Sequence, residues 1–262
     1  MINKKEFLLE SIIQAYIGSL EPIGSVQLKQ MYDLDYSSAT IRAYFKKLGD
    51  EGYLIQEHIS SGRVPTNVAL IEYWKTKMID IPENVDLKLL KYFTKELGLS
   101  VAFKKEQNSR LVEVKELDKR SLVLCFSDFV VSVNYSLALS RFLQDLIGFE
   151  VDELINIAKQ VGAYELYYEV SKKLYNNTYQ TLNLKEYLKM AIKYDMDEKS
   201  ITDFIDGTIF ENLKEGIYFD TIIPKGYMLI CSKIKINQEK AKMITIGDLT
   251  KNYNYFYERI AA

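Results

Sequence analysis

The sequence has few of the residues that build metal centres, disulfide frameworks and hydrolytic sites. Its 262 residues include one histidine, His58, and two cysteines, Cys125 and Cys231. One histidine cannot form a His-rich metal site, and the two cysteines do not have the spacing of a zinc site. The Walker A, G-x-G-x-x-G and G-x-S-x-G motifs are also missing. We therefore expect no metal, no cofactor and no catalytic residues.

Strong charge of one sign and long apolar runs are missing too. The chain has 34 basic and 36 acidic residues, a formal net charge of -2, so it is not a basic protein that coats nucleic acid. No apolar run reaches the ~18–20 residues of a membrane helix, and residues 1–10 are too charged for a signal peptide. Both cysteines lie in apolar runs, which is typical of reduced core thiols. These features predict a cytoplasmic protein.

The N-terminal residues show the pattern of two consecutive helices. Apolar residues recur at spacings of three and four over residues 4–20, which predicts an amphipathic helix. The segment 22–24 (Pro-Ile-Gly) interrupts this pattern, and Ser25 can cap a second, short helix that ends near Tyr32.

A third helix and a hairpin are predicted to follow. Ser37 or Ser38 can cap this helix, which runs to about Glu51, and Gly52 can end it. Strand-like residues then surround a Ser-Ser-Gly turn, which predicts a small wing. The remaining segments of this region are two strands at 53–56 and 64–66, a helix at about 68–78 and a linker at 81–84.

One face of the third helix suits DNA reading. Ile41, Phe45 and Leu48 fall on one side of a helical wheel and form a packing stripe. Small, cationic and hydroxyl side chains lie elsewhere on the helix, and these can enter a major groove, pair with guanine or neutralise phosphates. The predicted contacts on this helix are Ser37, Ser38, Ala39, Thr40, Arg42, Ala43, Lys46 and Lys47. A solvated cationic helix face is the alternative interpretation.

The wing tip offers a second set of contacts. Hydroxyls, a flexible glycine and an arginine suit phosphate contact or entry into a minor groove. The predicted contacts here are His58, Ser60, Ser61, Gly62, Arg63 and Thr66. The alternative for Arg63 is an ion pair with Glu57 across the hairpin.

The remaining sequence alternates between strand-like and helical composition. Helices are predicted at 87–98, over most of 137–199, and at 252–260. Strands are predicted at 100–103, 110–114, 121–134, 201–209, 226–236 and 241–247. Strands, then helices, then strands predict one α+β domain that contains an inserted helical segment.

Four blocks of residues resemble one known family. They are residues 21–25 (EPIGS), 37–42 (SSATIR), 48–54 (LGDEGYL) and 58–66 (HISSGRVPT). In this order they are similar to the family of the heat-inducible transcription repressor HrcA. Residues 247–253 resemble more loosely the Gly-Pro-Thr-Arg-Met-x-Tyr block at the C-terminus of the family. The chain departs from the family pattern at Ala43, which replaces an asparagine, and in this last block at Asp248, Lys251 and Asn252, which replace proline, arginine and methionine.

The resemblance implies a fold and a mode of action. It implies an α+β chain with a winged helix-turn-helix at 1–80, a GAF-like mixed α/β domain at 81–136 and 200–262, and an inserted dimerisation segment at 137–199. It also implies a homodimer that represses chaperone operons at an inverted-repeat operator, with the chaperonin GroEL as a partner that promotes the active form. Heat stress would relieve the repression.

Two other functions are considered. Twenty tyrosines and twelve phenylalanines could line a small-molecule pocket in the GAF-like domain, which would make the chain a ligand-sensing regulator. They are also typical of ordinary core and interface positions. An enzyme is disfavoured, because no acidic pair lies in a Gly-rich or His-containing context.

Overall fold

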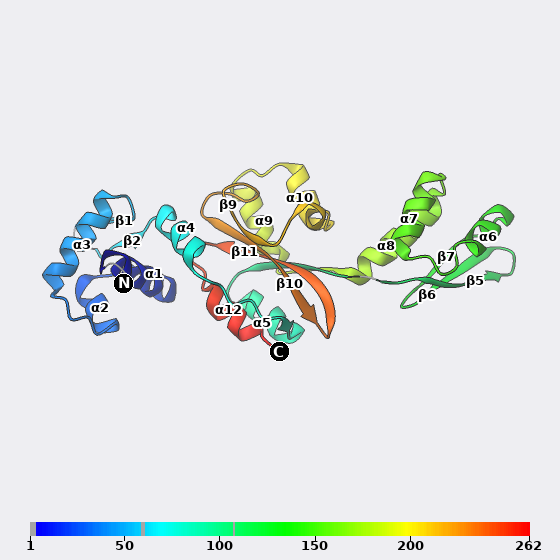
Figure 1. Cartoon of the computed structure of the whole chain (residues 1–262). Coiled ribbons are helices and arrows are strands. Elements are labelled where there is room, and N and C mark those ends of the chain that lie inside the picture. Colours follow the sequence, from blue (N-terminus) through cyan, green and yellow to red (C-terminus); the bar gives the residue numbers. More distant parts are fainter. Residues whose placement is uncertain (1–3, 59–60, 107) are drawn as a thin grey trace. The chain divides into compact units, whose positions relative to one another are not determined.

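The computed structural model describes residues 4–58, 61–106 and 108–262 (Figure 1). Its contacts divide the chain into two compact units. One contains the residues up to Ala102 together with Thr181–Ala262, and the other is Phe103–Gln180. We call residues 4–76 the N-terminal module, residues 84–102 and 181–262 the sheet region, and residues 103–180 the insert.

The N-terminal module contains three helices, a short hairpin and a fourth helix, in the predicted order. The elements are α1 (Lys4–Ser19), α2 (Ser25–Met31), α3 (Ser38–Asp50), β1 (Leu54–Ile55), β2 (Val64–Pro65) and α4 (Asn67–Thr76). Strands β1 and β2 pair antiparallel. Beside β2, Ile23 and Arg63 exchange both backbone hydrogen bonds, at 2.9 and 2.8 Å. The segment between α1 and α2 therefore holds the base of the wing.

The start of α2 differs by one residue from the prediction. The N-cap is Gly24, not Ser25, and the Gln27 side chain accepts a hydrogen bond from the Gly24 N–H at 3.3 Å. A glutamine that bonds back to the N-cap amide satisfies a donor that the helix leaves open, so a capping serine is not needed. After α3, Gly52 has the left-handed φ of +81° expected of a residue that ends a helix.

The core of the N-terminal module joins its first three helices and the hairpin. Helix α3 contributes Ile41, Phe45 and Leu48, which are all buried, so the predicted packing stripe is confirmed. The other buried apolar side chains of this cluster are Leu8, Ile12, Ala15, Ile23, Leu28, Leu34 and Leu54.

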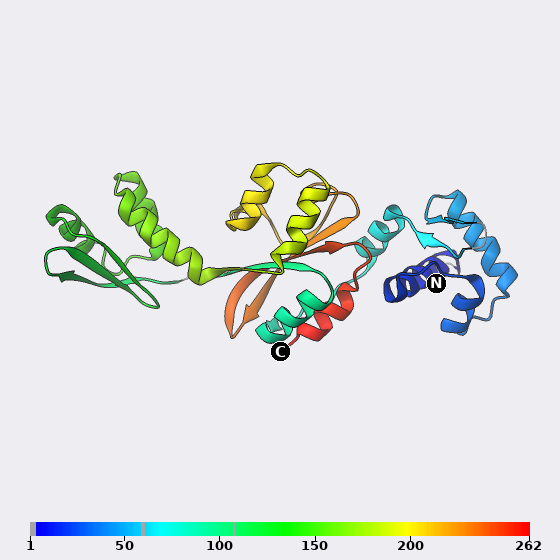
Figure 2. The same cartoon turned by 180° about the vertical axis from the view of Figure 1, so that it is seen from behind.

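The sheet region is a mixed sheet with helices on both faces (Figure 2). Its strands are β3 (Asn84–Val85), β4 (Ser100–Lys105), β8 (Tyr179–Leu182), β9 (Gly216–Phe219), β10 (Tyr227–Ile236) and β11 (Glu239–Asp248). They run in the order β3-β10-β11-β4-β8, and β9 also pairs with β10. The helices are α5 (Leu87–Glu96), α9 (Leu184–Lys193), α10 (Glu198–Ile205), α11 (Ile209–Asn212) and α12 (Tyr253–Ile260).

Strands β10 and β11 form the centre of this sheet. They pair antiparallel from Tyr227 opposite Asp248 to Ile236 opposite Glu239. Most of their residues are buried on both faces, because α5 and α12 cover one face and α9 covers the other (Figures 1 and 2). The predicted strands at 226–236 and 241–247 and the predicted helix at 252–260 are therefore confirmed.

One prediction in the sheet region is wrong, and another is off by one residue. Residues 201–209, predicted as a strand, lie in α10 and at the start of α11. The Asp197 side chain caps α10 by accepting from the Ser200 N–H at 2.9 Å, and buried Phe204 stacks on Tyr187 with ring centroids 3.8 Å apart. Local capping and one buried helical face thus outweigh the strand-like composition. The predicted linker at 81–84 ends in β3, which pairs parallel with β10.

The insert combines a small sheet with three helices. Strands β5 (Leu111–Leu117), β6 (Ser121–Phe126) and β7 (Val130–Asn134) form an antiparallel sheet, and α6 (Leu137–Gln144), α7 (Val151–Gln160) and α8 (Tyr164–Thr178) follow. The predicted strand at 121–134 is therefore two strands joined by a turn. Leu122, Leu124 and Val133 pack with Leu154 and Val170 in one core. This compact unit begins before the segment 137–199, so the strands 111–134 pack with the inserted helices. The assignment of 137–199 to dimerisation stays a prediction.

Candidate nucleic-acid interface

The outer side of α3 presents exposed cations. Six of its predicted contact residues are exposed: Ala39, Thr40, Arg42, Ala43, Lys46 and Lys47. In the part of the chain that the structure describes, Arg42, Lys46 and Lys47 make no ion pair with an acidic side chain. Three cations with small residues between them therefore extend from a helix whose opposite side is anchored in the core. Such a surface can approach a polyanion without breaking interactions of the fold.

The N-terminus of α3 is closed by its own hydroxyls. The Ser37 Oγ accepts a hydrogen bond from the Thr40 N–H at 3.0 Å and lies 2.9 Å from the Thr40 Oγ1. The sequence left the choice between Ser37 and Ser38 open, and the structure identifies Ser37 as the cap. Ser38 is the first helical residue and is half-buried. Its backbone N–H is among those that a helix leaves unpaired and that can bind a phosphate.

The serine at the wing tip shapes the turn. The Ser61 Oγ donates to the His58 carbonyl at 2.8 Å and accepts from the His58 N–H at 3.1 Å. The Ser61 backbone N–H donates to the same carbonyl at 2.9 Å. The side chain of Ser61 is thus engaged within the protein, whereas His58 is exposed. The predicted contact Ser60 lies outside the described residues.

Gly62 is needed for a close approach of two backbone segments. A Cβ on this residue would lie 2.5 Å from the Ile23 carbonyl carbon and 2.6 Å from the backbone of both Ile23 and Pro22. Contacts this short are not tolerated by real side chains, so the segment from Pro22 to Ile23 can pass the wing only beside a glycine. From the sequence, Gly62 was predicted to be a flexible tip residue. Its packing role could not be predicted, because the contact with Ile23 is 39 positions distant.

Arg63 and Thr66 lie at the base of the wing and differ in how their side chains are used. The Thr66 hydroxyl donates to the Gly52 carbonyl at 2.8 Å and accepts from the Ala69 N–H at 3.3 Å, so it caps α4. The Arg63 side chain is half-exposed. Among the described residues, Arg63 makes no ion pair with Glu57. Arg63 therefore remains available to a ligand, while the Thr66 hydroxyl is already bonded.

A joint between the N-terminal module and the sheet region was not predicted. Trp74 on α4 is 1% exposed and donates its Nε1–H to the Leu249 carbonyl at 2.8 Å. Its ring packs edge-on against Tyr253, with centroids 5.3 Å apart. The Tyr253 hydroxyl donates to the Asp248 carbonyl at 3.2 Å, and burial raises the pKa of this hydroxyl well above its usual value. The turn between β11 and α12 thus holds α4 in place.

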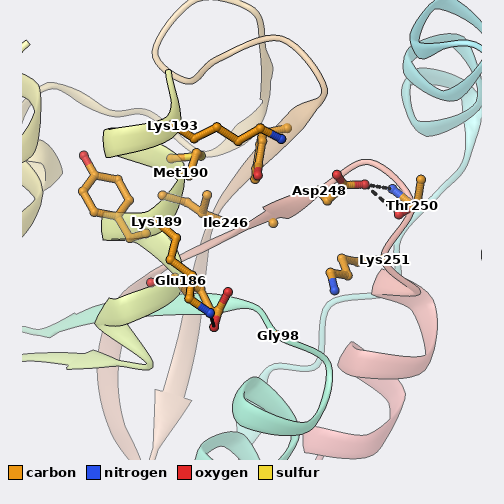
Figure 3. Close-up of a pocket in the computed structure, with 13 residues that line it drawn as sticks. Gly98, Glu186, Lys189, Met190, Lys193, Ile246, Asp248, Thr250 and Lys251 are labelled. Atoms are coloured by element: carbon orange, nitrogen blue, oxygen red, sulfur yellow. Dashed lines mark hydrogen bonds and ion pairs between the residues drawn. The ribbon is translucent and has the colours of Figure 1, made fainter. Parts of the chain in front are cut away.

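A cleft of about 300 Å³ lies beside this turn (Figure 3). Lysines from α9 and from the turn line it, together with Met190 and Ile246. A small-molecule pocket lined by many tyrosines and phenylalanines was considered from the sequence, whereas this cleft is lined by two tyrosines, Tyr187 and Tyr227, and by no phenylalanine.

The described residues were also compared with the requirements of metal sites, disulfides and membrane helices. No group of three or more His, Cys, Asp or Glu side chains among residues 4–58, 61–106 and 108–262 could hold a metal ion. Cys125 and Cys231 are free, and burial raises the pKa of the Cys231 thiol to about 11. None of the described helices is both long and apolar enough to cross a membrane.

Known proteins resemble the chain over its whole length. Residues 74–262 match the family model described as HrcA C-terminal domain. Two proteins named heat-inducible transcription repressor HrcA, from Helicobacter pylori strains J99 and 26695, are 34% and 33% identical over 260 residues, which cover 99% of this chain and 95% of each relative. A crystal structure described as that of a hypothetical protein at 2.2 Å resolution aligns over 100% of this chain and 98% of its own, with a TM-score of 0.57 and 18% identity. That likeness concerns the fold alone.

Proposed function

The chain belongs to the HrcA family of heat-inducible transcription repressors, and from this premise we propose that it represses by reading an inverted-repeat DNA operator as a homodimer. The family consists of repressors, which agrees with the expectation that the chain is not an enzyme. The single observation that carries the proposal is the outer side of α3, where Arg42, Lys46 and Lys47 are exposed and make no ion pair with any described residue, while the opposite stripe is buried.

Helix α3 acts as the reading helix. In a winged helix, the third helix enters the major groove and the wing contacts the flanking backbone. Arg42 is in a position to donate paired hydrogen bonds to a guanine, and Lys46 and Lys47 neutralise phosphates. Ala39 and Ala43 let the helix approach the base edges closely. Because the whole chain has a net charge of -2, non-specific attraction is weak and the specific contacts matter more.

In the wing, the Arg63 side chain contacts DNA, and the neighbouring residues fix the shape of the hairpin. Arg63 reaches the phosphate backbone or a minor groove, and exposed His58 lies at the tip. The roles proposed for Ser61, Gly62 and Thr66 are to position this arginine, since their hydroxyls or backbone are engaged inside the module.

The dimer forms through the helical part of the insert. Several large apolar side chains on α6, α8 and the turn before α8 are exposed: Leu137 at 57%, Val161 at 59%, Tyr164 at 61% and Tyr168 at 64%. Two of them, Val161 and Tyr164, line a shallow groove of about 530 Å³ together with Leu139, Phe142 and Leu166. Large apolar side chains that are exposed close together are typical of an interface. A two-fold dimer matches an inverted repeat because both have the same symmetry.

Heat relieves repression by lowering the population of the DNA-competent dimer. A margin of stability of a few kcal/mol is lost over a modest temperature rise, and a dimer loses affinity for a palindrome once its subunits separate. The chaperonin GroEL returns the repressor to its active form, as the family resemblance implies. The sheet region is the GAF-like domain of the family, and its mixed sheet with helices on both faces supports this assignment.

Selection of bound fragments from random DNA tests the proposal. The expected result is a sequence with two inverted half-sites, bound by two chains as measured by analytical ultracentrifugation of the complex. Replacing Tyr164 and Tyr168 by serine would weaken the dimer and, with it, binding to the full repeat. Enrichment of no sequence, or of a single half-site bound by one chain, would overturn the dimeric reading mode.

A further inference from the structure

The cleft beside the turn between β11 and α12 carries charge that the protein does not neutralise itself. Of its two carboxylates, Glu186 is paired with Lys189 at 2.9 Å. The other, Asp248, accepts from the Thr250 N–H at 2.8 Å and from the Thr250 hydroxyl at 2.6 Å. Figure 3 shows the Asp248 carboxylate hydrogen-bonded to Thr250, within the turn between β11 and α12. Glu186 is therefore neutralised by Lys189, whereas Asp248 is bonded only to neutral groups and keeps its negative charge. With three lysines and two carboxylates in its lining, the cleft has a net charge of +1.

Two cationic groups of the cleft remain. Lys193 extends from the end of α9, and Lys251 extends from the turn before α12 (Figure 3). The Lys193 ammonium lies over the ring of Tyr194, 5.1 Å from its centroid, and neither lysine makes an ion pair within the described ranges of the chain. Two ammonium groups from separate elements at one cleft form a site of positive potential that an anion can occupy.

A buried hydroxyl of the same cleft has no partner. Ser100 at the start of β4 lines the cleft and is 1% exposed, and its Oγ makes no hydrogen bond to any described residue. An unsatisfied buried hydroxyl is costly and is rare in folded proteins. The Oγ is covered by its neighbours, so an acceptor oxygen of a ligand satisfies it only when the cleft wall at Ser100 moves outward. The open hydrogen bond is an observation independent of the lysines, and it also indicates a ligand with oxygen acceptors.

The remaining wall is apolar. Met190 and Ile246 are buried and line the cleft with the side chain of Tyr187. We propose that this cleft binds a small organic anion, in which a carboxylate or phosphate head is attracted by the ammonium groups of Lys193 and Lys251, and a small apolar body packs on Met190 and Ile246. The volume of about 300 Å³ is at the lower end for small-molecule sites, so the body has the size of one ring or a short branched chain.

The site is connected to α4 by the turn that forms its edge. Asp248 and Thr250 line the cleft, and the residue between them, Leu249, accepts the hydrogen bond from Trp74. Trp74 is the only tryptophan of the chain, so its fluorescence reports a change in this turn. An effect of the ligand on DNA affinity rests on the proposed function, whereas binding to the cleft can be measured without DNA.

Titration of the full-length protein with benzoate, phenyl phosphate and neutral benzyl alcohol tests the proposal. Trp74 emission and calorimetric heat would be followed for each compound up to millimolar concentration. We expect saturable binding of at least one of the two anions, and the two arms distinguish a carboxylate from a phosphate head. Benzyl alcohol, which has the same ring without the charge, should not bind.

Variants locate the site. Lys193→Met and Lys251→Met should each weaken anion binding about tenfold or more, since a hydrogen bond to a charged group is lost. Ser100→Ala should weaken it less. Lys185→Met, on the exposed side of the same helix α9, should bind as the wild type does. Thermal unfolding of each variant checks that the fold is retained. Binding of neither anion, equal binding of benzyl alcohol, or full affinity in Lys193→Met and Lys251→Met would overturn the proposal.

Discussion

Helix α3 and the wing were both predicted to contact DNA, and the structure uses their side chains differently. On α3, the cations are exposed and unpaired in the described part of the chain, and removal of one would leave the core intact. In the wing, Ser61 and Thr66 bond to backbone groups of the module, and Gly62 lies against the backbone of Ile23. The predicted contact surface therefore divides into two groups: residues of α3 that are available to contact DNA, and residues of the wing that hold the hairpin in shape.

This difference predicts opposite outcomes for mutations. On α3, DNA affinity should change while stability stays constant. In the wing, stability should change while the affinity of the folded fraction stays nearly constant, except at Arg63, whose side chain is available to a ligand.

The largest effect is expected for Gly62→Ala. The new Cβ would lie 2.5 Å from the Ile23 carbonyl carbon, so the wing or the segment before α2 must move. Overpacking against backbone should lower the free energy of unfolding by about 3 kcal/mol. Urea unfolding followed by Trp74 fluorescence measures this, because Trp74 belongs to the same module.

Gly18→Ala is the matched control. Gly18 lies exposed in α1, and a Cβ there would meet nothing within 4 Å. The same substitution should raise the free energy of unfolding there by up to about 1 kcal/mol, since alanine favours a helix. An unchanged midpoint in Gly62→Ala would contradict the shaping role of this glycine.

The next effect is the loss of operator affinity in Arg42→Ala. If the guanidinium donates to a guanine, binding should weaken by roughly 1–3 kcal/mol and the preference at one base position should relax. Fluorescence anisotropy with the selected operator and with point variants of it measures both quantities. The urea midpoint should not move.

Lys91→Ala on α5 removes one exposed cation from the sheet region and serves as the control. It should leave operator affinity unchanged. If Arg42→Ala bound the operator with wild-type affinity, the proposal that α3 reads the DNA sequence would be contradicted.

The smallest effect is expected for Thr66→Val, which keeps the shape and removes the hydroxyl. Loss of the N-cap of α4 and of the bond to the Gly52 carbonyl should cost about 1 kcal/mol of stability. Operator affinity of the folded protein should remain. A variant of normal stability and weakened affinity would instead assign Thr66 to DNA contact.

The parts of the fold that could be predicted from the sequence depend on nearby residues. The buried stripe of α3 and the end of that helix at Gly52 follow from spacing and from local backbone preference. Residues 201–209 show where this information was misread. Their apolar composition indicated a strand, but Asp197 three residues before Ser200 is a capping signal and was overlooked.

The remaining features require partners far along the chain. Trp74 and Leu249 are 175 positions apart, and no local pattern indicates their hydrogen bond. The cleft combines lysines of α9 and of the turn before α12 with Ser100 of β4, so it exists only once the sheet has formed.

By itself, the sequence determined that the segment between Ser37 and Gly52 forms an amphipathic helix with its cations on the outside, since this follows from residue types three and four positions apart. Only the tertiary structure decided what the wing residues do. Ser61 is engaged by the nearby His58, but Gly62 and Thr66 are engaged by the backbone of Ile23 and Gly52, which lie far along the chain. Whether such a residue is available to DNA depends on which backbone group lies within hydrogen-bond or van der Waals distance, and folding brings the distant groups together.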